Sequence, residues 1–72
     1  MSTFVCIVGA LDEERWFCSF EAAERWARKR VRQLDGRGFS RPISIERHEH
    51  GFTVDLATVH LDGADRVWTD MR

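Results

Sequence analysis

The chain has 72 residues, of which 43% are hydrophobic and 32% are charged, and its formal net charge is -1. This length allows one domain with a modest core. The net charge near zero excludes binding to nucleic acid or membrane that is driven by overall charge. The sequence has no apolar run of about 18 residues and no signal-peptide pattern, so we expect an intracellular, cytoplasmic protein.

The first part of the chain predicts two short strands joined by a polar turn. Residues 3–9 are largely β-branched and have apolar side chains on both faces, which is typical of an interior strand. Residues 11–14 form the turn, and residues 15–18 form the returning strand. A shift of one residue in the register would exchange the faces of this strand. A turn centred on Asp12 gives the register Val8 with Trp16, Cys6 with Cys18 and Phe4 with Phe20.

Residues 20–35 predict one amphipathic helix around which the strands are arranged. Ser19 is a suitable N-cap because its hydroxyl can accept a hydrogen bond from the first turn. Gly36 offers a left-handed end to the helix. We expect the packing of the apolar stripe on a sheet to be the main stabilising contact of the domain. The stripe residues, which recur at helical spacing, are Phe20, Ala23, Ala27, Val31 and Leu34.

The last part of the chain predicts three more strands. Residues 43–49 alternate between apolar and polar side chains, and residues 50–51 are the expected hairpin turn. Residues 52–61 return along this strand, with a bulge near residues 56–57 where the apolar phase shifts. An Asp-Gly turn then precedes a final strand at residues 66–70.

Together these elements predict an α+β fold of order β-β-α-β-β-β, with residues 1–72 forming a single small domain. Short hairpin connections favour a mostly antiparallel sheet, packed against the one helix. The strand order within the sheet stays open, as does the oligomeric state, monomer or homodimer.

The sequence does not predict a catalytic or metal centre. Zinc needs several converging ligands, whereas His60 lies far along the strand from His48 and His50, so we interpret these histidines as part of a solvated polar hairpin. Neither Cys6 nor Cys18 has a histidine nearby in the sequence that would activate its thiol, which favours structural thiols. The register above would also allow a disulfide between them. We therefore expect no enzyme activity, no cofactor and no bound metal.

The predicted helix carries a basic face opposite to its apolar stripe. Glu21 and Glu24 lie four residues before two of the arginines and absorb part of the charge through i,i+4 pairs. The face is either a solvated surface or an electrostatic contact with nucleic acid or with an acidic protein surface. Its basic residues are Arg25, Arg28, Lys29 and Arg32.

The three tryptophans are further candidates for contact with a partner. Trp26 lies at the edge of the stripe, where it either stacks with Arg30 in a cation–π pair or anchors a partner. Trp16 and Trp68 lie on short strands. We expect at least one of the three to be partly exposed, and core packing to be the role of the other two. The predicted partner-binding residues are Arg25, Arg28, Lys29, Arg32, Trp26 and Trp68.

The helix and the last hairpin carry motifs that resemble those of a known family. Residues 19–29 have the form S-[apolar]-x-x-A-x-R-[apolar]-A-x-K. They are followed by Ile45-Glu46, Gly51-Phe52, Asp62-Gly63, Trp68 and Asp70. This pattern resembles small phage-encoded anti-CRISPR proteins that act on type I systems, in particular inhibitors of type I-F, which have a similar length and strand-helix order.

The resemblance implies a non-enzymatic protein of the bacterial cytoplasm that binds a crRNA-guided surveillance complex, Cascade, and blocks its binding to target DNA. Arg25 and Lys29 match basic helix positions of the pattern. The segment between Gly51 and Trp68 and the acidic residues 12–14 depart from it, which leaves the CRISPR subtype, the subunit and the contact face open.

Two hypotheses about function follow from these patterns. The first is an anti-CRISPR-like inhibitor whose charged helix face and tryptophans contact a Cascade subunit. The alternative is a small phage or prophage protein that binds nucleic acid, or has an accessory role, through the basic helix face.

Overall fold

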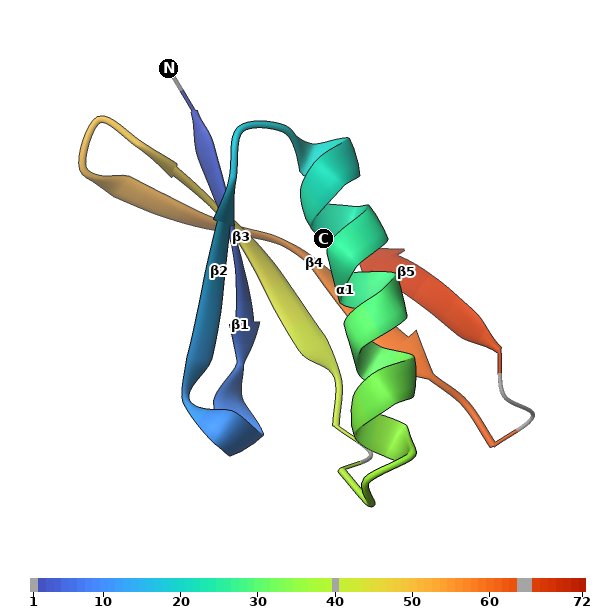
Figure 1. Ribbon diagram of the computed structural model, residues 1–72. Helices are drawn as coiled ribbons and strands as arrows, with labels where there is room; N and C mark the ends of the chain where they lie inside the picture. Colours follow the sequence, from blue (N-terminus) through green and yellow to red (C-terminus); the bar gives the residue numbers. More distant parts are fainter. Residues whose placement is uncertain (1, 40, 64–65) are drawn as a thin grey trace.

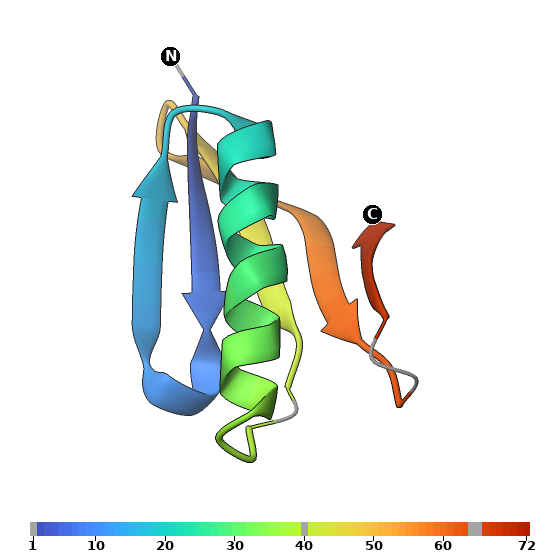
Figure 2. The same cartoon turned by 45° about the vertical axis from the view of Figure 1, so that its right-hand side comes forward.

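The computed structural model describes residues 2–39, 41–63 and 66–72, in which one helix lies across one face of a five-stranded antiparallel sheet (Figures 1 and 2). The elements are β1 (Thr3–Val8), a 3-10 turn (Gly9–Leu11), β2 (Glu13–Phe17), α1 (Phe20–Asp35), β3 (Ile43–Glu49), β4 (Phe52–Leu61) and β5 (Val67–Met71). The strand order is β2-β1-β3-β4-β5, so β1 is an interior strand and β2 and β5 are the edges. The predicted α+β fold and element order are confirmed.

The register of β1 with β2 differs from the predicted register by three residues. Val8 pairs with Glu13 in place of Trp16. The chain turns through the 3-10 segment and through Asp12, which has a left-handed conformation (φ 52°), so β2 begins earlier than expected. A shift by an odd number exchanges the faces of a strand. Trp16 therefore lies opposite Val5, on the face of the sheet that points away from α1.

The same shift separates the two cysteines. Cys6 pairs with Arg15, and Phe4 pairs with Phe17, so the predicted pairs of Cys6 with Cys18 and of Phe4 with Phe20 are wrong. Cys18 lies beyond the end of β2 and is exposed. Both thiols are free, and the disulfide that the predicted register allowed does not form.

The start of α1 is stabilised by the predicted N-cap. Ser19 has an extended conformation, and its hydroxyl accepts a hydrogen bond from the Ala22 amide at 3.2 Å. This bond satisfies one of the amides that have no partner within the helix. The observed bounds, Phe20–Asp35, equal the range predicted from the apolar period.

The left-handed end of the helix is at Gly38 and not at the predicted Gly36. Gly36 has φ -63°, and its amide still donates to the Arg32 carbonyl at 3.2 Å. Gly38 has φ 87°. The amide of Gly38 donates to the Asp35 carbonyl, and the amide of Phe39 donates to the Leu34 carbonyl. This is the Schellman arrangement, displaced by two residues because the helical turn continues through Gly36.

The strands that follow the helix are close to those predicted. His50 (φ 48°) and Gly51 (φ 81°) both have positive φ, as the turn of a tight hairpin requires. Leu56 has no register partner in β3, which is the bulge predicted from the shift in apolar phase. β5 runs from Val67 to Met71, one residue later at each end than predicted.

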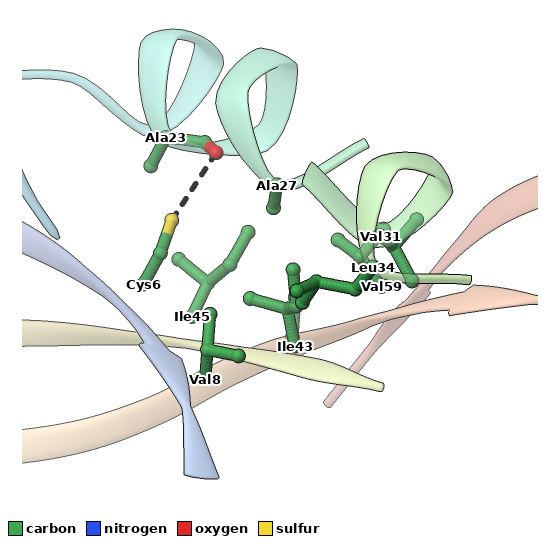
Figure 3. Packing of buried hydrophobic residues seen from close by; sticks show 10 residues of the cluster. Cys6, Val8, Ala23, Ala27, Val31, Leu34, Ile43, Ile45 and Val59 are labelled. Atoms are coloured by element: carbon green, nitrogen blue, oxygen red, sulfur yellow. Dashed lines mark hydrogen bonds between the residues drawn. The ribbon is translucent and has the colours of Figure 1, made fainter. Parts of the chain in front are cut away.

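The core lies between α1 and the sheet (Figure 3). Two alanines at the centre of the stripe allow the helix backbone to approach β1 closely. Phe20, at the end of the stripe, is only partly buried and makes an edge contact with Phe4 at 6.3 Å. The buried cluster consists of Cys6, Val8, Ala23, Ala27, Val31, Leu34, Ile43, Ile45, Ala57 and Val59.

Replacement of Leu34 should destabilise the domain more than replacement of any exposed leucine. Leu34 is 1% exposed, so Leu34→Ala leaves a cavity and is expected to cost about 2–5 kcal/mol of the free energy of unfolding. Leu11, which is 37% exposed, provides the matched control, because Leu11→Ala should change stability by about 0.5 kcal/mol or less. Urea denaturation of the two variants measures this difference. Equal losses would contradict the packing described here.

Candidate binding surface

The four basic residues predicted from the helix are all solvent-exposed on α1. We call this surface the cationic helix face, and it consists of Arg25, Arg28, Lys29 and Arg32. Glu24 forms one of the two predicted pairs, with 3.9 Å between its Oε2 and Nη1 of Arg28. Within the described part of the chain, Arg25, Lys29 and Arg32 have no side-chain hydrogen bond or ion pair, so the predicted pair of Glu21 with Arg25 does not form there. Three long cations are therefore available to an external partner.

Arg28 has a different role, because it holds the edge strand β5 against α1. Its Nη1 donates to Oγ1 of Thr69 at 2.9 Å, and its Nη2 donates to the carbonyl of Val67 at 3.0 Å. An open groove of about 500 Å³ lies here, lined by Arg28, Lys29, Arg32, Gln33 and Val67. Arg28 contributes charge to this groove, whereas Lys29 and Arg32 are free to donate to a ligand in it.

Trp26 lies at the edge of the core. Its ring contacts the ring of Phe17 at 6.0 Å, and it packs as a partly buried residue against the buried cluster. Arg30, which was the alternative stacking partner, is held by Glu13: its Nε and Nη2 donate to the two carboxylate oxygens at 3.1 and 2.8 Å. This forked ion pair ties α1 to the edge strand β2.

The other two tryptophans lie on the sheet face opposite α1. Trp16 is 51% exposed and Trp68 is 45% exposed. Only Trp26 packs against the core, so the expectation that two of the three would do so is wrong. Trp16 makes an edge contact with His48, with ring centres 5.0 Å apart, and Trp68 stacks on His60 at 4.3 Å.

We call the surface that carries Trp16 and Trp68 the open sheet face. One row of register partners crosses it from edge to edge: Glu14 on β2, Ile7 on β1, Ser44 on β3, Thr58 on β4 and Asp70 on β5. The sequence alone did not reveal this surface, because the position of Trp16 depends on the β1–β2 register. The available signal was the recurrence of a carboxylate and a tryptophan two residues apart, once near each end of the chain.

The histidines are dispersed over the sheet. Nε2 of His48 on β3 lies 3.2 Å from a carboxylate oxygen of Glu46, while His60 on β4 stacks on Trp68 of the edge strand β5. Among the residues that the structure describes, no three His, Cys, Asp or Glu side chains are grouped so that they could hold a metal ion.

Cys6 is a buried thiol that belongs to the core. Its side chain is 0% exposed, and its Sγ donates to the Ala23 carbonyl at 3.2 Å (Figure 3). Burial raises the pKa of the Cys6 thiol to about 12. Because the thiolate is the nucleophilic form, this thiol is unreactive at neutral pH. Cys18, in contrast, is exposed.

No protein-family model, curated protein or solved structure matches this chain. Within the ranges that the structure describes, no helix combines the length and the apolar character that crossing a membrane requires.

The two thiols should differ sharply in reactivity. At pH 8 a thiol reagent is expected to modify Cys18 in the native protein and to leave Cys6 unmodified, because Cys6 is buried and protonated. Mass spectrometry should therefore find one modified cysteine in native protein and both in urea. Cys18→Ser should abolish labelling of the native protein. Rapid modification of Cys6 without denaturant would show that the helix does not cover it as described.

Proposed function

We propose that this chain is a non-catalytic binding protein whose cationic helix face contacts the phosphate backbone of a nucleic acid. The supporting observation is that Arg25, Lys29 and Arg32 are exposed and have no side-chain partner within the described part of the chain. Their spacing of four and three residues places them one above another on the same side of a helix. A row of cations on a rigid helix suits the regular charge of a phosphate backbone.

The attraction is local, because the whole chain has a net charge of only -1. The cationic helix face contains four basic residues, of which Arg28 is already engaged by Glu24 and β5. The face can therefore contact at most about three phosphates, which implies moderate affinity and a clear dependence of binding on salt concentration. The compartment proposed for this function is the one expected from the sequence, the cytoplasm of a bacterial cell.

A second candidate is an anti-CRISPR-like inhibitor that binds Cascade and blocks its binding to target DNA. Arg25 and Lys29 match basic positions in the pattern that resembles this family, and both belong to the set of cations without a partner in the described chain. In this case the same face contacts an acidic surface of a Cascade subunit. Both candidates use the cationic helix face and differ in the partner.

Binding to a short fluorescent DNA duplex at several salt concentrations tests the first candidate. For three phosphate contacts, log K should fall against log salt concentration with a slope of about -2.7. The variant Arg25→Glu/Lys29→Glu/Arg32→Glu should lose this binding. The control Arg15→Glu/Arg37→Glu/Arg41→Glu makes the same change in net charge at exposed positions that do not belong to the face, and it should bind as the wild type does. If both variants lose DNA binding equally, the binding depends only on overall charge, which would contradict the proposed site.

Capture of a purified type I Cascade complex tests the second candidate with the same variants. The wild type and the control variant are expected to bind the complex and to prevent it from binding target DNA, whereas the helix-face variant should do neither. If the chain inhibits Cascade but does not bind plain DNA, the nucleic-acid proposal is wrong and the inhibitor candidate takes its place. If Cascade is neither bound nor inhibited, the inhibitor candidate is wrong.

A further inference from the structure

Each edge strand presents an exposed tryptophan and an exposed carboxylate on the open sheet face. On β2 these residues are Glu14 and Trp16, and on β5 they are Trp68 and Asp70. The side chains of Glu14 and Asp70 have no hydrogen bond or ion pair with another described residue. Because residues two apart in a strand are about 7 Å apart on the same face, one cationic group can reach both the carboxylate and the ring.

The centre of the open sheet face is also acidic. Glu46 and Asp55 are register partners on β3 and β4. Asp55 forms an ion pair with Arg72 at 3.1 Å, and Glu46 contacts His48. The paired strands thus present the carboxylates of Glu14, Glu46, Asp55 and Asp70 on this face. The nearby cations are Arg72, which pairs with Asp55, and Arg66, which lies beside Trp68 and pairs with Asp62. A phosphate backbone is repelled by such a surface, whereas a basic protein segment is attracted.

We propose that the open sheet face binds a basic segment of a partner protein through two arginine or lysine side chains, one at each edge strand. Each cation pairs with a carboxylate and lies on a tryptophan ring, as in a cation–π contact. The stack of Trp68 on His60 holds that ring in place and still leaves 45% of the side chain exposed. This inference does not rest on the proposed function, because it uses the side of the molecule opposite the cationic helix face.

The strand order sets the spacing of the two cations in the segment. Glu14 and Asp70 lie in one row of register partners that crosses from β2 to β5. These edge strands are four strand spacings apart, which corresponds to about 19 Å. An extended peptide covers this distance in about six residues. The preferred segment therefore carries two basic residues about six positions apart, and adjacent basic residues can fill only one of the sites.

The test uses two peptides of equal charge and NMR spectra of the full chain. In one glycine-serine peptide the two arginines are about six positions apart, and in the other they are adjacent. The spaced peptide should bind more tightly and shift the indole signals of both Trp16 and Trp68. Glu14→Lys and Asp70→Lys should each weaken its binding about two- to fivefold, the range typical of exposed charge pairs. Glu21→Lys makes the same charge change on the exposed side of α1 and should leave binding unchanged.

Several results would overturn this inference. Equal binding of the two peptides would remove the two-site arrangement, and equal effects of Asp70→Lys and Glu21→Lys would show that only net charge matters. Shifts confined to α1 would place the peptide on the wrong face. If the face instead associates with a second copy of the chain, sedimentation should show a dimer that Asp70→Lys disrupts and that the peptide does not dissociate. Because Glu14 and Asp70 are exposed, unchanged circular dichroism is expected for their variants.

Discussion

The burial of one helical stripe against one face of the sheet is the contact on which the rest of this structure depends. A chain of 72 residues has a modest core, and in the part described here a single helix covers the sheet. Ala23 and Ala27 bring that helix close enough for Cys6 to donate to a helix carbonyl. On the opposite face of the sheet, the open sheet face, only side chains of the strands themselves cover the described part of the chain. Val5 is 1% exposed there although no helix of the described residues lies over it.

Hydrogen bonds from two arginines connect the helix to the two edge strands of the sheet. The fork between Arg30 and Glu13 holds β2 to the helix, and the two hydrogen bonds of Arg28 hold β5. Both arginines lie on α1, so the helix organises the edge strands as well as the core. One consequence is chemical, since arginines that clamp strands are less available to a partner than Arg25, Lys29 and Arg32. Exposure alone would not have separated Arg28 from these three cations, because all four are exposed.

The fold also separates charges that nearly cancel in the sequence. Basic residues gather on the outer side of α1, while carboxylates and two exposed tryptophans gather on the open sheet face. Opposite sides of the molecule therefore suit partners of opposite charge. An overall charge of -1 conceals this arrangement, because only the position of each side chain on an element and of each element in the fold determines the local field.

The sequence by itself determined the features that depend on neighbouring residues: the Ser19 cap, the helix of residues 20–35, the turn at His50 and Gly51, and the bulge at Leu56. These follow from short-range hydrogen bonding and side-chain period. Only the tertiary structure decided the β1–β2 register, and with it the exposure of Trp16, because a strand with apolar residues on both faces fits several registers about equally well. It also decided that Arg28 clamps β5, since those residues are 39 to 41 positions apart and no local pattern connects them.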